Sequence, residues 1–266
     1  MWGIIPAAGQ GNRIQPLAFS KELLPVGSCS DRGEERPRAV SEYLIERMIL
    51  AGADKLCFVI SPRKSDIIDY YGDSIAGAKL AYLVQPEPAG LCDAVFRAAP
   101  FVADGEQVVI GLPDTVWFPD DALCSLSSAL FSLLLFPVRE PQFFDAVVTR
   151  PDGTVAKICV KQLHPESTWV WGALRMPAAT FRELFNLWNF RHKSDQYLGT
   201  LIHAYIAGGG VVYGVRRGET YVDVGTVHGY REAIRMLSER QMSATPASLD
   251  VRPRLYGVRR RSSSQI

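Results

Sequence analysis

The sequence predicts an α/β protein in which a mainly parallel β-sheet is flanked by helices, with a smaller lobe formed by the second half of the chain. Three observations predict this class. Apolar strand segments alternate with helix-like segments through residues 2–110. Those strand segments are continuously apolar, which is typical of parallel strands that are buried on both faces. Beyond them, the turn signal Pro151-Asp152-Gly153 indicates a hairpin and a change of character.

The elements of the first half follow in order. The apolar run 2–6 ends at Ala7-Ala8-Gly9, as expected for a buried strand that enters a loop. Apolar residues recur at helical spacing over 40–51, and Gly52 stands where a helix commonly ends. The same reasoning predicts a strand at 55–60, a short helix at 65–71, a strand at 80–84, a helix at 89–99 and a strand at 107–110. This order is Rossmann-like, so ligands are expected at the carboxyl ends of the strands.

The second half is predicted from turn signals and helical periodicity. Strands at 144–149 and 155–161 flank the hairpin turn. The remaining elements are a strand at 168–175, helices at 178–190 and 195–207, a strand at 211–215 and a final amphipathic helix at 226–237. We therefore expect one domain over 1–241, composed of the halves 1–125 and 126–241. Residues 242–266 show no periodicity, and the run Arg259-Arg260-Arg261 is expected to lie in a disordered tail.

Composition excludes several classes of protein. The 29 Lys and Arg residues nearly balance the 28 Asp and Glu residues, so no overall field favours nucleic acid or a lipid surface. The apolar stretch 129–138 is too short to span a bilayer. The five cysteines are scattered without a Cys-x-x-Cys pair, which is typical of reduced thiols and argues against a zinc site. We expect a cytoplasmic protein whose partners are neither nucleic acid nor membrane.

The first candidate site is the glycine-rich loop Ala8-Gly9-Gln10-Gly11-Asn12, which follows the first strand and precedes Arg13. Small residues let backbone amides approach an anionic group, and Arg13 and Lys21 add cations that suit phosphate. A dinucleotide fingerprint would need glycine where Ile14 stands, and a phosphate-loop NTPase would need Gly-Lys-Ser/Thr, so neither pattern fits. A plain tight turn would explain the glycines equally well.

The segment 4–26, IIPAAGQGNRIQPLAFSKELLPV, resembles the signature of the sugar-1-phosphate nucleotidylyltransferases, in particular the glucose-1-phosphate thymidylyltransferases and the UTP–glucose-1-phosphate uridylyltransferases. It departs from the family pattern at Asn12 and Ile14. The resemblance extends over about residues 3–240. It implies the nucleotide-diphospho-sugar transferase fold, with the nucleotide bound by 1–125 and the sugar phosphate by 126–241.

The segment 84–91, VQPEPAGL, resembles the part of the family that reads the pyrimidine base. There a glutamine, here Gln85, contacts the base edge, and a glycine, here Gly90, lets the backbone approach it. An amide offers a donor and an acceptor, as uracil or thymine requires. Without the resemblance, a proline-rich loop that leads into a helix explains the segment. The nucleotide-binding residues implied are Ala8, Gly9, Gly11, Asn12, Gln85 and Gly90.

Two aspartates are implied as ligands of Mg²⁺. Asp114 ends the strand segment VIGLPD, and Asp223 stands in YVDVGT, which resembles the family pattern W-x-D-x-G-T. Magnesium prefers oxygen ligands and commonly takes one or two carboxylates, with phosphates and water completing its shell. Pro113 and Thr115 depart from the family's glycine and asparagine. Either aspartate alone is explained equally well as a strand-end cap.

The second half contains the implied acceptor residues. Lys161, in VKQ where the family has Glu-Lys-Pro, would hold the sugar phosphate, and Gly172 would line the sugar site with its backbone. Asp195 aligns with a glutamate that binds sugar hydroxyls, although it could equally be a charge at the start of a helix. Asp145 stands where the family often has glycine. Either the alignment shifts by one residue there, or the sugar differs from glucose.

The resemblance implies transfer of a nucleotidyl group from an NTP, with dTTP or UTP favoured, to a sugar 1-phosphate, with release of pyrophosphate. Catalysis would rest on positioning and charge neutralisation by Arg13, Lys21, Asp114 and Lys161. Asp145 favours the alternative of a non-sugar acceptor such as phosphocholine. The departures at Asn12, Pro113 and around Lys161 leave open a non-catalytic nucleotide-binding homologue. A homo-oligomer is possible by analogy with the family.

Overall fold

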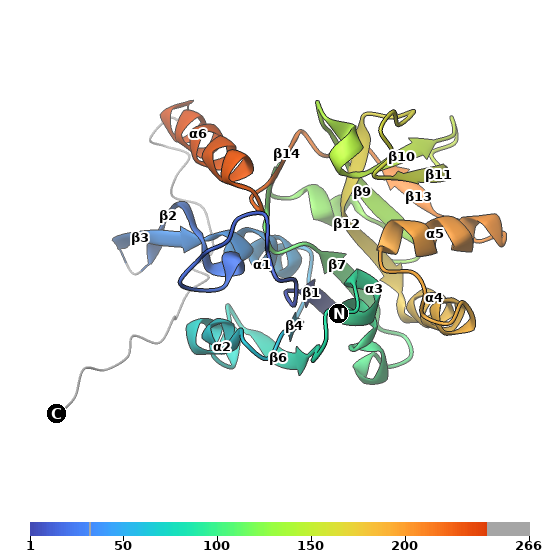
Figure 1. Cartoon of the computed structure of the whole chain (residues 1–266), viewed down its shortest axis with the longest axis horizontal. Coiled ribbons are helices and arrows are strands. Elements are labelled where there is room, and N and C mark those ends of the chain that lie inside the picture. Colours follow the sequence, from blue (N-terminus) through green and yellow to red (C-terminus); the bar gives the residue numbers. More distant parts are fainter. Residues whose placement is uncertain (32, 244–266) are drawn as a thin grey trace.

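The parallel half of the central sheet comes from the first half of the chain. In the computed structural model, which describes residues 1–31 and 33–243 (Figure 1), strand β1 lies between β4 and β7, and β6 follows β4. The bounds are β1 (Trp2–Pro6), β4 (Lys55–Ile60), β6 (Ala78–Val84) and β7 (Gln107–Gly111), with the short β5 (Ser74–Ile75) antiparallel at the edge. Ile4 is aligned with Cys57 on one side and Ile110 on the other, both in parallel register. The predicted α/β class is confirmed.

The antiparallel half joins this sheet through β12 (Trp169–Pro177), which pairs with β7. Beside β12 lie β9 (Ser132–Pro137), β10 (Asp145–Thr149), β11 (Val155–Val160) and β13 (Tyr213–Val215), which complete ten strands. Strand β9 was not predicted from the sequence, although its first five residues are buried. One continuous sheet therefore connects the two halves of the chain.

Helices cover the sheet on both faces (Figure 1). Their bounds are α1 (Val40–Leu50), α2 (Ser65–Tyr71), α3 (Leu91–Phe96), α4 (Ala178–Phe190), α5 (Leu198–Ala207) and α6 (Val227–Ser243). Successive residues of β1 contact opposite layers: Ile4 packs with α3, α4 and α5, and Ile5 packs with α1 and α2. The predicted start of a helix at Asp195 is wrong by three residues, because α5 begins at Leu198.

Smaller elements complete the fold. A hairpin of β2 (Pro25–Asp31) and β3 (Glu34–Ala39) packs against α6, and a separate two-stranded ladder joins β8 (Thr115–Phe118) to β14 (Thr220–Asp223). Single 3₁₀ turns are η1 (Lys21–Leu23), η2 (Ala99–Phe101), η3 (Ala122–Ser125) and η4 (Pro141–Phe143). Helix α6 extends to Ser243, and residues 244–266 of the predicted tail lie outside the described residues.

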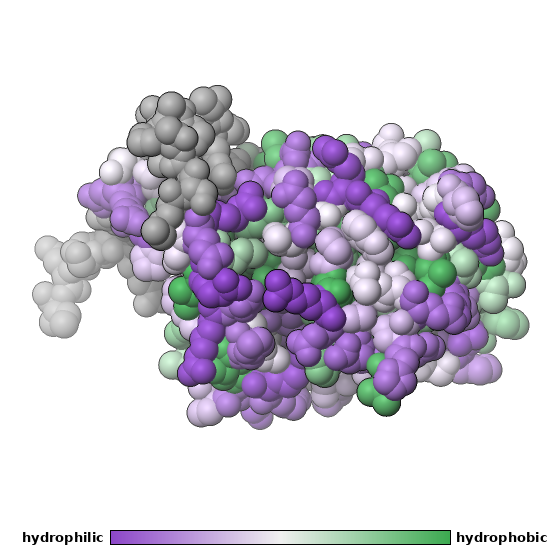
Figure 2. All heavy atoms as spheres, turned by 90° about the horizontal axis from the view of Figure 1, so that it is seen from above, coloured by the Kyte–Doolittle hydropathy of each residue, from purple (hydrophilic) through white to green (hydrophobic). Residues whose placement is uncertain are grey.

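The surface agrees with this arrangement. The face shown in Figure 2 carries mostly hydrophilic side chains, and the hydrophobic ones stand in small separate groups. Of the helices that the structure describes, none has the length and apolar character needed to cross a membrane.

Candidate active site

The candidate site lies where neighbouring strands end. Strands β1 and β7 are parallel neighbours, so the loops that follow Pro6 and Gly111 emerge at the same edge of the sheet. The ladder of β8 and β14 then aligns Thr115 with Asp223, and the amide of Val224 donates to the carbonyl of Asp114 at 2.8 Å. Two aspartates that are distant in the sequence therefore lie on adjacent backbones.

Three charged groups converge on the backbone of Gly225. A β-carbon on Gly225 would lie 2.8 Å from Asp223 Oδ1, 3.2 Å from Asp114 Oδ2 and 3.2 Å from Arg13 Nη2. The amide of Gly225 donates to Asp223 Oδ1 at 2.7 Å and fixes that carboxylate. Gly225 was not among the predicted site residues. The signal that could have identified it is its position two residues after Asp223 in the YVDVGT segment.

Each carboxylate is paired with one of the predicted cations. Arg13 Nη2 donates to Asp223 Oδ2 at 3.1 Å, and Lys21 Nζ donates to Asp114 Oδ2. The aliphatic part of Lys21 lies against Gly11, where a β-carbon would approach Lys21 Cδ to 2.9 Å. The structure thus brings the glycine-rich loop, η1 and the two aspartates together.

The two carboxylates differ in their electrostatics. Burial, together with the like charge of Asp114, raises the pKa of Asp223 above its ordinary value. Burial acts in the same direction on Asp114, but the Lys21 ammonium outweighs it and lowers the pKa of Asp114. For Lys21, burial is outweighed by Asp114 and Glu22, so its pKa is raised. The site therefore contains two carboxylates and two cations that neutralise one another.

The predicted base-reading residues lie at the same edge of the sheet, after β6, which β4 separates from β1. Gln85 follows β6, and its Nε2 donates to the Gly90 carbonyl at 3.1 Å and to Asp93 Oδ2 at 2.7 Å. Both partners are acceptors, so they fix the orientation of the Gln85 amide. The oxygen Oε1 is then the atom of this amide that can accept a hydrogen bond from a ligand. Gly90 has φ of 94°, and a β-carbon there would lie 2.9 Å from Gln196. The loop before α5 therefore packs closely against this segment.

Lys161 and Asp145 occupy one neighbourhood at the end of the β10–β11 hairpin. Asp145 is aligned with Val160, next to Lys161, and accepts a hydrogen bond from Trp171 Nε1 at 3.3 Å. Burial raises the pKa of Asp145, although Trp171 and Lys161 partly oppose it. The ammonium of Lys161 lies 4.2 Å from the centre of the Tyr197 ring, a cation–π contact.

Gly172 and Asp195 have local partners. The Asp195 carboxylate accepts hydrogen bonds from Arg191 at 2.7 and 3.0 Å. A β-carbon on Gly172 would lie 2.6 Å from the rings of both Phe136 and Tyr221, so glycine lets β12 pack against them. Their predicted contacts with a sugar stay predictions.

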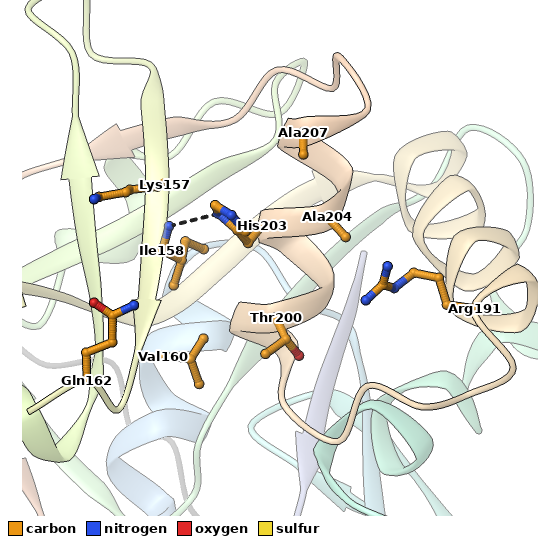
Figure 3. A pocket seen from close by; sticks show the side chains of 9 residues that line it. All are labelled: Lys157, Ile158, Val160, Gln162, Arg191, Thr200, His203, Ala204 and Ala207. Carbon is orange, nitrogen blue, oxygen red and sulfur yellow. Dashed lines mark hydrogen bonds between the residues drawn. The ribbon is translucent and has the colours of Figure 1, made fainter.

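A cavity of about 610 Å³ lies between β11 and α5. Figure 3 shows His203 on α5 directed toward β11, where the amide of Ile158 donates to His203 Nδ1 at 3.4 Å. Val160 and Gln162, on either side of Lys161, also line it. The cavity therefore borders the predicted acceptor residues and not the aspartate pair.

The chain is similar to known nucleotidyl transferases. The family model for nucleotidyl transferases matches residues 2–240. The chain belongs to the nucleotidyl transferase family. A glucose-1-phosphate thymidylyltransferase of Neisseria gonorrhoeae is 26% identical over 243 residues, which cover 88% of this chain and 81% of that protein. A UTP–glucose-1-phosphate uridylyltransferase of Haloferax volcanii is 22% identical, with 92% of this chain and all of that protein covered.

Among solved structures, the UTP-bound UGPase of Acinetobacter baumannii superposes with a TM-score of 0.72 at 19% identity. The superposition covers 94% of this chain and 99% of the other, and it supports the fold. These comparisons confirm the predicted family and its enzyme class, a nucleotidyltransferase.

Proposed function

We propose that this enzyme transfers a nucleotidyl group from dTTP or UTP to a sugar 1-phosphate and releases pyrophosphate. The observation that carries the proposal is the convergence of Asp114, Asp223 and Arg13 beside Gly225, with Lys21 paired to the first of these. The two relatives described above are named for thymidylyl and uridylyl transfer with glucose 1-phosphate, which supports the choice of substrates.

The two aspartates fit a Mg²⁺ ion. Their oxygens are the ligand type that magnesium prefers, and the charge of Asp114 helps to raise the pKa of Asp223, an effect that a bound cation would oppose. Within residues 1–31 and 33–243, no group of three or more His, Cys, Asp or Glu side chains is placed to hold a metal. Two carboxylates suffice for Mg²⁺ when phosphates and water complete its shell. Bound there, the ion would neutralise charge on the phosphates of the nucleotide.

The side chains of this enzyme would supply positioning. The attacking oxygen of a sugar phosphate is already ionised at neutral pH, so no general base is required. Arg13 and the amides of Gly9 and Gly11 would bind the leaving pyrophosphate, and Lys21 would stabilise charge at the α-phosphate. Both cations would exchange their carboxylate partners for phosphate oxygens. Lys161, backed by the Tyr197 ring, would bind and orient the acceptor phosphate.

The orientation of Gln85 supports a preference for uracil or thymine. Its Nε2 is already bonded to Gly90 and Asp93, so Oε1 would accept a hydrogen bond from the base. Uracil and thymine can donate their N3–H to this oxygen, whereas cytosine has no N3–H and would have to present its N4 amino group, which stands where uracil and thymine have O4.

Asp145 favours a second candidate acceptor. A buried carboxylate next to the lysine assigned to the acceptor phosphate suits a phosphate that also carries a cationic group, as phosphocholine or an amino-sugar phosphate does. The sugar 1-phosphate remains the first proposal because the family relatives are named for it.

Pyrophosphate release tests these proposals. The purified chain would be assayed with each of dTTP, UTP, CTP, GTP and ATP against hexose 1-phosphates, amino-sugar phosphates and phosphocholine, with and without Mg²⁺. We expect Mg²⁺-dependent release with dTTP or UTP and a hexose 1-phosphate. Release with phosphocholine alone would select the second candidate. Nucleotide binding by calorimetry without release from any pair would overturn both and indicate a non-catalytic homologue.

A further inference from the structure

A buried ion pair joins the glycine-rich loop to the turn that carries Lys21. Lys64 Nζ donates to both carboxylate oxygens of Glu22 at 2.8 Å and to the carbonyl of Ala7 at 2.7 Å. Glu22 is 1% exposed and Lys64 is 7% exposed. All three ammonium hydrogens of Lys64 therefore have partners. Ala7 lies just after β1, Glu22 lies in η1 and Lys64 immediately precedes α2.

Ser20, the residue before Lys21, is bound by the first turn of α2. The amide and the hydroxyl of Ser20 each donate to a carboxylate oxygen of Asp66 at 2.6 Å. Asp66 is the second residue of α2. The residues before and after Lys21 are thus both bound to the start of α2, so the main chain at Lys21 is fixed at two adjacent points.

The role of this pair is not explained by stability alone. Removing two charges from water is costly, and apolar residues of similar volume often stabilise a protein as well as a buried ion pair does. An apolar pair, however, could not bind the carbonyl of Ala7. What the pair adds is a defined spacing between the loop that begins at Ala7 and the backbone that carries Lys21.

We infer that Glu22 and Lys64 are positioning residues, which hold the Lys21 ammonium at a fixed spacing from the glycine-rich loop. The inference rests on the proposed function, in which that loop and Lys21 bind the phosphates of one nucleotide. Neither Glu22 nor Lys64 touches the substrate. A displacement of about 1 Å in a positioned group can lower turnover about 10²-fold, so loss of this spacing acts mainly on kcat.

Paired substitutions test the inference. The variant Glu22→Leu with Lys64→Met removes both charges and leaves no unpaired buried ion. We expect it to fold, with kcat reduced about 10- to 100-fold and KM for the nucleotide within about threefold of the wild type. The variant Glu22→Gln with Lys64→Gln retains hydrogen-bonding amides without charge, and we expect it to recover most of the lost kcat.

The pair Arg36–Glu42 provides a matched control. Arg36 binds both oxygens of the buried Glu42 at 2.9 and 3.1 Å, and neither residue is among the predicted site residues. Replacing it by Met and Leu should change Tm but leave kcat unaltered. If Glu22→Leu with Lys64→Met does not fold, Glu22→Asp tests the positioning role instead. This variant keeps both charges but shortens one of the two side chains. It should lower kcat at nearly unchanged Tm.

The outcomes separate the two proposals. An active wild type combined with full kcat in every folded Glu22 and Lys64 variant would refute the positioning role alone. A loss of kcat that the control pair reproduces would also refute it, because the effect would then be general destabilisation. A wild type that releases no pyrophosphate from any substrate pair would refute the proposed function, and this inference with it.

Discussion

Replacing Gly225 by alanine would place a methyl group where the charged groups of the site converge. The new β-carbon would lie 2.8 Å from Asp223 Oδ1 and 3.2 Å from both Asp114 Oδ2 and Arg13 Nη2. The first distance is shorter than a normal van der Waals contact, and the amide of Gly225 holds that oxygen at 2.7 Å. The carboxylate must therefore move, or the backbone of Gly225 must move away from it.

The size of the effect follows from the required displacement. A shift approaching 1 Å in a positioned charge costs about 10²-fold in rate, which corresponds to about 2.7 kcal/mol in the activation free energy. We expect kcat/KM for pyrophosphate release to fall by that factor in Gly225→Ala, while Tm changes little because the perturbation is local. Steady-state assays at saturating Mg²⁺, together with scanning calorimetry, measure both quantities.

Gly208→Ala is the matched control. Gly208 ends α5, and a β-carbon there would make only ordinary contacts, the nearest at 3.5 Å. This variant should keep the wild-type rate. If Gly225→Ala also kept kcat/KM within threefold of the wild type at the same Tm, the convergence of Asp114, Asp223 and Arg13 would not be the catalytic centre, and the reasoning would be refuted.

Three further predictions concern single charges. Asp114→Asn or Asp223→Asn should lower turnover about 10²-fold or more, and wild-type rates in either at saturating Mg²⁺ would exclude it as a ligand. Lys161→Met should raise KM for the acceptor but not for the nucleotide, and equal changes in both would contradict its assignment to the acceptor phosphate. Burial raises the pKa of Asp145 above 3.8, so its ionisation costs stability as pH rises through the folded pKa, and the cost is absent below the unfolded value. Asp145→Asn should therefore raise Tm at pH 7, and in calorimetry this gain should shrink as the pH falls toward 4; a gain independent of pH would show that charge is not its cause.

The parallel core could be predicted from the sequence because its strands are continuous apolar runs between clear helical segments. Strand β9 could not, since residues 132–136 are buried on both faces and such a run lacks a period that distinguishes strand from helix. The hairpin of β2 and β3 was missed for the opposite reason. Charged and polar residues dominate it, and much of it is exposed, so no apolar face marks it as a strand.

The candidate site could be predicted where motif residues mark it, as Asp114 and Asp223 do, and the structure brings these two carboxylates together beside Gly225. The side chains with which each site residue forms hydrogen bonds or ion pairs could not be predicted, because they depend on which segments the fold brings together. Glu22 and Lys64 give no local sign that they form a pair. Asp195 was predicted to contact a sugar, which stays a prediction, and nothing in the sequence indicated that Arg191 would bind its carboxylate. The role of Gly225 follows only from the groups that surround it.

The ladder between β8 and β14 has a consequence for synthesis of the chain. Asp114 leaves the ribosome long before Asp223, and the two meet only when residues 220–223 pair with 115–118. A polypeptide released before that point would contain the glycine-rich loop, Lys21 and one carboxylate, but not the second. If the two aspartates act as proposed, unfinished chains would lack one of the Mg²⁺ ligands and would release no pyrophosphate, so activity would appear only after translation has passed Asp223.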